Sequence, residues 1–128
     1  MQRHFYNIWY KTELKCRGLF INVPRFLLAL KSDITTPDPY IAAIKANILD
    51  ADIVVWDEIG TKSPSTFEHE YLLNYINARI DAGKSNIYTS NLGDQALKEV
   101  LGDRLYSRVV NNSHDIEFFG SDKRGLKI

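Results

Sequence analysis

The chain has 128 residues, of which 45% are apolar and 25% are charged, the ordinary balance of a globular protein of one domain. Sixteen basic and sixteen acidic side chains give a formal net charge of zero, which argues against a uniformly basic nucleic-acid-binding protein. The single cysteine, Cys16, cannot form an internal disulfide, and no apolar run approaches the roughly 20 residues that span a bilayer. We therefore expect a cytoplasmic protein with no membrane segment.

Short continuous apolar runs alternate along the chain with segments whose apolar residues recur at helical spacing. The pattern predicts, in chain order, a helix over residues 1–14, a strand over 19–23, a helix from Pro24, a loop over 32–38, a helix over 39–49, a strand over 53–56, a helix over 65–82 that ends before Gly83, a strand over 86–90, helices over 94–101 and 104–110, and a strand over 115–119. The inner strands are apolar throughout, which is typical of a parallel sheet covered by helices on both faces. Residues 1–128 are predicted to form one α/β domain.

The run IVVWDE, residues 53–58, ends in two carboxylates. Such a strand delivers Asp57 and Glu58 to the carboxyl edge of the sheet, where open α/β sheets bind ligands. Asp57 suits Mg²⁺, which takes oxygen ligands, and Glu58 suits polarisation of an attacking water. The competing interpretation, a buried strand that ends in an acidic turn, carries equal weight.

Asn91 follows the next apolar strand, where its amide is suited to orienting a water or contacting a phosphate. A turn or helix cap is the simpler role for an asparagine at that place. Arg104 and Arg108 are four residues apart on a predicted helix and therefore share a face. Their guanidinium groups suit phosphates, including those of a neighbouring subunit, although such a face is often only solvated. Arg124, in the charged tail, is a weaker candidate of the same kind.

No phosphate-binding loop of the form G-x-x-x-x-G-K-[ST] occurs in the sequence. The one Gly-Lys-Ser, residues 83–85, has Ala78 at the position of the first glycine, and it lies between a predicted helix and a strand. Backbone N–H groups cradle phosphates in the opposite order, between a strand and a helix. This segment is therefore predicted not to bind phosphate.

Taken in order, GLFINVPRFLLALK, IVVWDEIG, IYTSNL, LGDRLYSRV and SDKRG resemble the AAA+ domain of the DnaC/DnaI family of bacterial and phage helicase loaders. The resemblance implies a P-loop NTPase fold, a five-stranded parallel sheet sandwiched by helices. It implies that Asp57 and Glu58 are the Walker B pair, with Asp57 on Mg²⁺, and that Asn91 is the first sensor. Arg108 matches the arginine finger, Arg104 lies one turn earlier on the same nucleotide-facing helix, and Arg124 matches the second sensor.

Members of this family bind and hydrolyse ATP, assemble as oligomers and deliver the replicative DNA helicase to single-stranded DNA during DNA replication. The resemblance implies the same cofactors and partners here, with a homo-oligomer formed through the face that carries Arg104 and Arg108. The chain departs from the family because the first strand and the Walker A loop do not occur in it. We therefore expect a partial AAA+ domain with an open sheet edge, a gap in its core and little or no ATP hydrolysis on its own.

Two other functions are compatible with these motifs. A non-hydrolysing interaction module would present Arg104 and Arg108 to a helicase or loader partner without a nucleotide of its own. A transposase-associated ATPase subunit carries the same motifs, and an adjacent transposase gene would distinguish it from a loader.

Overall fold

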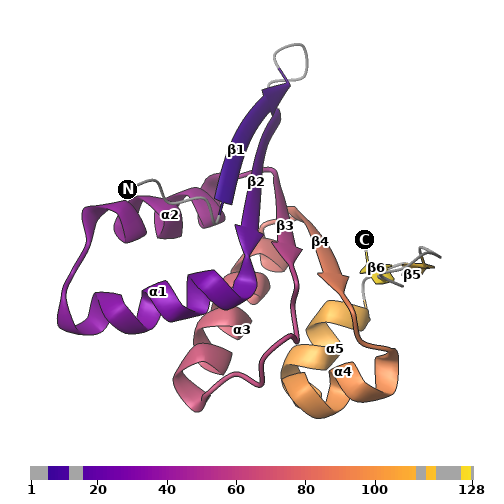
Figure 1. Cartoon of the computed structure of the whole chain (residues 1–128). Coiled ribbons are helices and arrows are strands. Elements are labelled where there is room, and N and C mark those ends of the chain that lie inside the picture. The colour runs from indigo at the N-terminus through magenta and orange to yellow at the C-terminus, as the bar shows by residue number, and fades with distance from the viewer. Residues whose placement is uncertain (1–5, 12–15, 112–114, 118–124, 128) are drawn as a thin grey trace.

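A computed structural model describes residues 6–11, 16–111, 115–117 and 125–127. Figure 1 shows one sheet with helices packed against it. The elements are β1 (Tyr6–Lys11), β2 (Cys16–Asn22), α1 (Val23–Thr35), α2 (Pro39–Asp50), β3 (Ile53–Asp57), α3 (Thr66–Asp81), β4 (Ser85–Ser90), α4 (Asp94–Leu101), α5 (Asp103–Val110), β5 (Asp115–Glu117) and β6 (Gly125–Lys127). Among the described residues, no helix is long and apolar enough to cross a membrane.

The sheet has the strand order β1-β2-β3-β4-β6-β5. Its centre, β2, β3 and β4, is parallel, with connections through helices, so the predicted α/β fold with a parallel sheet is confirmed for these three strands. The outer strands β1, β6 and β5 are antiparallel to their neighbours, which the sequence did not predict. The expectation of an open sheet edge is not met at β4, because β6 pairs with it from Tyr88 to Ser90.

The N-terminal segment forms a strand where a helix was predicted. β1 pairs with β2 in an antiparallel hairpin whose register runs from Tyr6 opposite Ile21 to Lys11 opposite Cys16. The sequence of β1, YNIWYK, is rich in aromatic and β-branched residues, which favour strands. Pairing with the edge of β2 therefore determined the conformation of this segment, although the spacing of its few apolar residues favoured a helix.

The helices α1, α2 and α3 begin at side-chain caps that the sequence contains. Asn22 accepts a hydrogen bond from the backbone N–H of Arg25 and caps α1, and Ser65 forms a reciprocal capping box with Glu68 at the start of α3. Gly83, with φ +71°, follows α3 as predicted. The predicted loop over residues 32–38 was too long, because α1 continues to Thr35.

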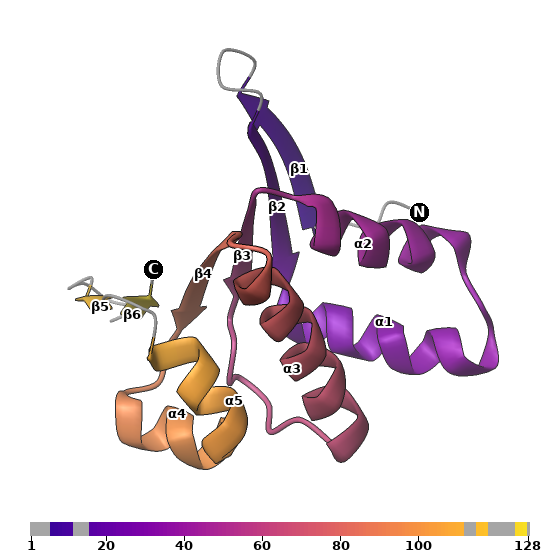
Figure 2. The same ribbon diagram turned by 180° about the vertical axis from the view of Figure 1, so that it is seen from behind.

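The hydrophobic core lies on one face of the sheet. Figure 2 shows α2 and α3 in front of the strands, and Figure 1 shows the same helices behind them. Buried side chains from all five described helices meet one set of strand residues, namely Leu19, Ile21, Val54, Trp56 and Tyr88.

The large apolar side chains at the alternate positions of the same strands point to the other face and are only partly buried. Phe20, Ile53, Val55 and Ile87 belong neither to the core nor to the residues packed against it. The predicted sheet sandwiched by helices was therefore wrong for the described helices, which cover one face.

Arg79 of α3 joins three elements at the amino end of the parallel strands. Its side chain is 1% exposed, and its nitrogens donate to the carbonyl oxygens of residues 48, 51, 52 and 85 and to Oδ1 of Asn86, at 2.6 to 3.3 Å. A guanidinium group has five N–H donors, so this one is fully used in holding the ends of α2, β3 and β4. Burial lowers the pKa of Arg79 to about 10.

Candidate functional site at the carboxyl edge of the sheet

Polar side chains gather where the three parallel strands end. Asn22 ends β2 and is in register with Asp57, which ends β3, while Thr89 lies one residue before the end of β4. Parallel strands bring these ends to one edge, so the sequence-based expectation for Asp57 is met in position. The carboxylate of Asp57 is 8% exposed and thus lies below the surface of this edge.

The hydroxyl of Thr89 links both carboxylate residues to β4. It donates to Oδ1 of Asp57 at 2.5 Å and accepts from the backbone N–H of Glu58 at 3.0 Å. The carbonyl oxygen of Thr89 also accepts from the N–H of Ile59 at 2.9 Å. One threonine therefore sets the orientation of the Asp57 carboxylate and the path of the chain after β3.

Glu58 has a strained backbone that its neighbours hold in place. Its φ is +59°, a left-handed conformation that costs a non-glycine residue roughly 1–2 kcal/mol. Its carbonyl oxygen accepts from the hydroxyl of Thr61 at 2.9 Å, and its Oε2 accepts from Nδ2 of Asn22 at 3.1 Å. Strain of this kind concentrates at functional sites, and here it directs the Glu58 side chain toward β2.

Asn91, the predicted sensor, comes directly after β4 in the sequence. Asn91 follows the last residue of β4 and is exposed, and Ser90 is buried and accepts from the N–H of Leu92 at 3.1 Å. Asn91 therefore lies at the carboxyl edge, after the hydrogen-bonded residues of β4. The role of Asn91 as a sensor stays a prediction.

The two arginines of α5 lie on its exposed side. Leu105 and Val109 turn into the core, whereas Arg104 and Arg108, each one residue earlier, are exposed and share one face of α5, as their spacing predicted. Nη1 of Arg104 lies 3.3 Å from Oε1 of Glu70 on α3, an exposed ion pair of small energetic weight. Arg124 lies outside the described residues.

The chemistry of this edge fits a hard cation shared with a ligand. Asp57, Thr89 and Asn22 offer carboxylate, hydroxyl and amide oxygens, and Mg²⁺ usually takes one or two carboxylates together with phosphate oxygens and water. Nowhere in the described part of the chain do three or more His, Cys, Asp or Glu side chains gather to hold a metal by themselves.

The Gly-Lys-Ser segment lies at the opposite end of the sheet. Gly83 and Lys84 precede β4, of which Ser85 is the first residue, and Nζ of Lys84 donates to the carbonyl oxygen of Asp50 at 3.1 Å. The segment therefore lies at the amino end of β4, away from Asp57 at the carboxyl edge.

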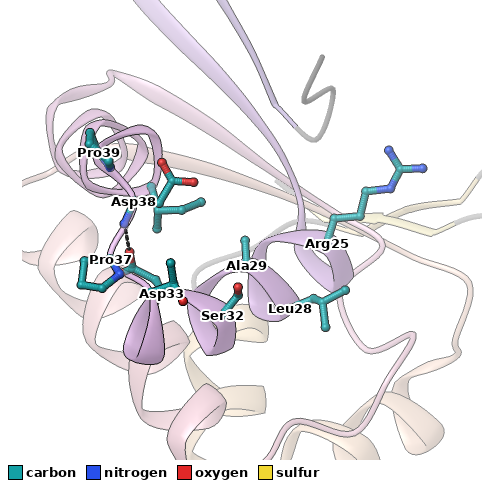
Figure 3. Close-up of a pocket in the computed structure, with 10 residues that line it drawn as sticks. Arg25, Leu28, Ala29, Ser32, Asp33, Pro37, Asp38 and Pro39 are labelled. Atoms are coloured by element: carbon teal, nitrogen blue, oxygen red, sulfur yellow. Dashed lines mark hydrogen bonds between the residues drawn. The ribbon is translucent and has the colours of Figure 1, made fainter. Parts of the chain in front are cut away.

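A separate hollow lies between α1 and α2 (Figure 3). It has a volume of about 720 Å³, and its lining includes Leu28, Ala29 and Ile41 beside Asp33. The N–H of Asp38 and then the Lys45 ammonium lower the pKa of Asp33, so this carboxylate already has partners within the fold. The hollow does not include the residues of the carboxyl edge.

Asn22 and Thr89 are functional candidates that sequence reasoning missed. Both residues were included only within longer strand motifs, although a polar residue at the end of an apolar strand by itself indicates a candidate site. The pairing of Asn22 with Glu58 and of Thr89 with Asp57 spans more than 30 residues of sequence, which no local pattern contains.

The comparisons of the sequence with protein-family profiles and with curated proteins identify no family for this chain. No protein-family profile matches the chain, and no curated protein matches it significantly. The structure by itself establishes a small α/β domain with a three-stranded parallel centre.

Proposed function

We propose that this chain is a DNA replication protein related to the DnaC/DnaI helicase loaders, and that its carboxyl edge supplies the carboxylates of a Mg²⁺–ATP site. The observation that carries this proposal is the bonded array of Asn22, Asp57, Glu58 and Thr89. Two adjacent carboxylates differ there in burial and in partners, which is the arrangement expected when one holds a metal and the other handles a proton.

The two carboxylates would act differently on a bound nucleotide. Mg²⁺ would neutralise phosphate charge, and Asp57 would hold it. Glu58, turned toward Asn22 by its left-handed backbone, would accept a proton from a water near the terminal phosphate. The sequence has no glycine-rich loop for the other phosphates, so we expect weak binding and little hydrolysis by this chain alone.

The proposal is tested by Mn²⁺-dependent binding of a fluorescent ATP analogue to the full chain. We expect weak binding that requires the metal and is lost in Asp57→Asn, which preserves the size of the side chain. Asp81→Asn, a change of an exposed acid at the end of α3, is the matched control and should bind as the parent does. Metal-dependent binding that survives Asp57→Asn would contradict the assignment of the site, and a folded chain that binds no nucleotide would contradict the proposal.

The exposed arginines of α5 support a second candidate, an interaction module that binds a helicase, a loader or a second copy without nucleotide. A solvated face with two guanidinium groups four residues apart suits an acidic or phosphate-bearing surface. In a binding assay with a replicative helicase, Arg108→Ala should weaken association, whereas Arg25→Ala, a change of an exposed arginine on α1, should not. If the two variants weakened association equally, Arg108 would contribute only general charge attraction and not a specific interface.

A further inference from the structure

Arg25, in the first turn of α1, is held beside the carboxyl edge by the same amide that holds Glu58. Oδ1 of Asn22 accepts from the backbone N–H of Arg25 at 3.1 Å, and Nδ2 of Asn22 donates to Oε2 of Glu58 at 3.1 Å. Asn22 ends β2 in register with Asp57, which ends β3. The backbone of Arg25 and the two carboxylate residues are therefore neighbours at one edge of the sheet.

The guanidinium group of Arg25 is exposed and has no counter-ion within the described part of the chain. No acidic residue lies in the first turn of α1. The ion pairs among the described arginines and lysines have other members, namely Arg17 with Asp50, Lys45 with Asp33 and Arg104 with Glu70. Arg25 stands at one end of the hollow between α1 and α2, and Figure 3 shows its side chain extending away from the other residues of that hollow. Its positive charge is therefore available to a ligand.

The residues assigned above to the nucleotide site provide no positive charge. Asp57 and Glu58 are acids, Asn22 and Thr89 are neutral, and the sequence has no glycine-rich loop with its lysine. A nucleoside triphosphate with one bound Mg²⁺ keeps a net negative charge, so two carboxylates without a nearby cation would repel it. A guanidinium group is suited to this task because it presents parallel N–H donors to phosphate oxygens.

We propose that Arg25 binds the terminal phosphate of the nucleotide and makes the site prefer a triphosphate to a diphosphate. This inference rests on the proposed function, in which Glu58 accepts a proton from a water near that phosphate. Because one amide holds both Arg25 and Glu58, the terminal phosphate is the part of the nucleotide that Arg25 meets. The role concerns bound nucleotide alone, so association with a helicase in the absence of nucleotide does not depend on Arg25.

The test compares the Mn²⁺-dependent affinities of fluorescent ATP and ADP analogues for the full chain. We expect the parent to bind the triphosphate about 10- to 100-fold more tightly than the diphosphate, the usual effect of one charge-assisted contact. Arg25→Gln should bind the two analogues within a few-fold of each other, with its affinity for the diphosphate close to that of the parent. Arg25→Lys retains the charge without the planar group and should recover part of the preference.

Lys31→Gln is the matched control, because Lys31 is an exposed cation of the same helix, about two turns farther from the edge. It should retain the preference of the parent for the triphosphate. Urea unfolding of Arg25→Gln should match that of the parent, because the exposed guanidinium has no described contact to lose.

The outcomes separate this inference from the proposal on which it rests. If Arg25→Gln keeps the preference for the triphosphate while Asp57→Asn loses nucleotide binding, the site stands and the role of Arg25 is overturned. Equal loss of the preference in Lys31→Gln and Arg25→Gln would overturn that role as well, because general charge attraction would then explain it. A folded parent chain that binds neither analogue would overturn both the site and the role of Arg25.

Discussion

Replacing Thr89 with valine removes one hydroxyl that bonds both carboxylate residues, while it preserves the size and branching of the side chain. The bond to Asp57 has a charged acceptor, a type worth about 1.5–3 kcal/mol, and an unsatisfied Glu58 N–H costs about 1–3 kcal/mol. Water at this partly exposed edge replaces some of the loss, so we expect destabilisation of about 2–4 kcal/mol. A domain of this kind has a stability of about 5–15 kcal/mol, so the variant should still fold.

The assay is urea unfolding followed by circular dichroism. Thr89→Ser retains a hydroxyl that donates and accepts, so it should restore most of the free energy of unfolding. Thr35→Val is the matched control, since the hydroxyl of Thr35 donates only to a carbonyl in the exposed last turn of α1, and this change should cost less than about 0.5 kcal/mol. If Thr89→Val and Thr89→Ser lose equal stability, the hydroxyl does not act as described.

The same variants address the metal site. If Asp57 binds Mg²⁺ as proposed, Thr89→Val should weaken Mn²⁺–nucleotide binding about 10- to 100-fold, as the loss of a residue that orients a ligand usually does. Thr89→Ser should bind within a few-fold of the parent. Equal affinity of Thr89→Val and the parent would mean that the orientation of Asp57 is set by other contacts.

Three further predictions concern the fold. Arg79→Met leaves buried carbonyl groups unsatisfied and should cost about 3–5 kcal/mol in urea unfolding, and a loss under 1 kcal/mol would show that water replaces the guanidinium. Burial raises the pKa of Tyr75 to about 12 and raises that of Tyr88, so the neutral forms stabilise the fold fully below pH 10 and this contribution fades as pH rises toward 12. The chain has seven tyrosines, so the part of the tyrosinate absorbance that belongs to Tyr75 and Tyr88, measured as the difference from a Tyr75→Phe/Tyr88→Phe variant, should appear together with unfolding and not before it. Gly60→Ala places a Cβ 2.7 Å from a leucine of α4 at φ +86° and should cost about 1–3 kcal/mol in urea, whereas Gly93→Ala, with open space around it, should cost under 1 kcal/mol.

The parts of the fold that the sequence predicted are those with local causes. The run over residues 53–56 is β3, and the amphipathic segment that starts after Ser65 is α3, because an apolar run and a capped amphipathic helix are each fixed within a few turns of chain. The strand β1 was mistaken for a helix, because what decides its conformation is the free edge of β2. That edge is a feature of the assembled sheet, not of the segment itself.

The prediction of two covered faces failed for a different reason. Continuous apolar strands indicate that both faces avoid water, but they do not indicate which element covers each face. Val54 and Val55 are equally apolar in sequence, yet Val54 is buried under helices and Val55 is partly exposed on the other side. The same limit applies to the site: Asp57 and Glu58 could be predicted from one strand, but their bonds to Thr89 and Asn22 depend on neighbouring strands.

The other face of the sheet and the carboxyl edge are physically coupled, because Asp57 continues the row of Ile53 and Val55 along β3. Any element that covered this row would exclude water from around Asp57, which strengthens its bond to Thr89 but raises the cost of desolvating the charged carboxylate. A cation at Asp57 would offset that cost. Linkage then requires that covering the row raise the affinity for Mg²⁺ by the factor by which Mg²⁺ favours the covered state. Covering the sheet and binding the metal are therefore expected to behave as one cooperative event.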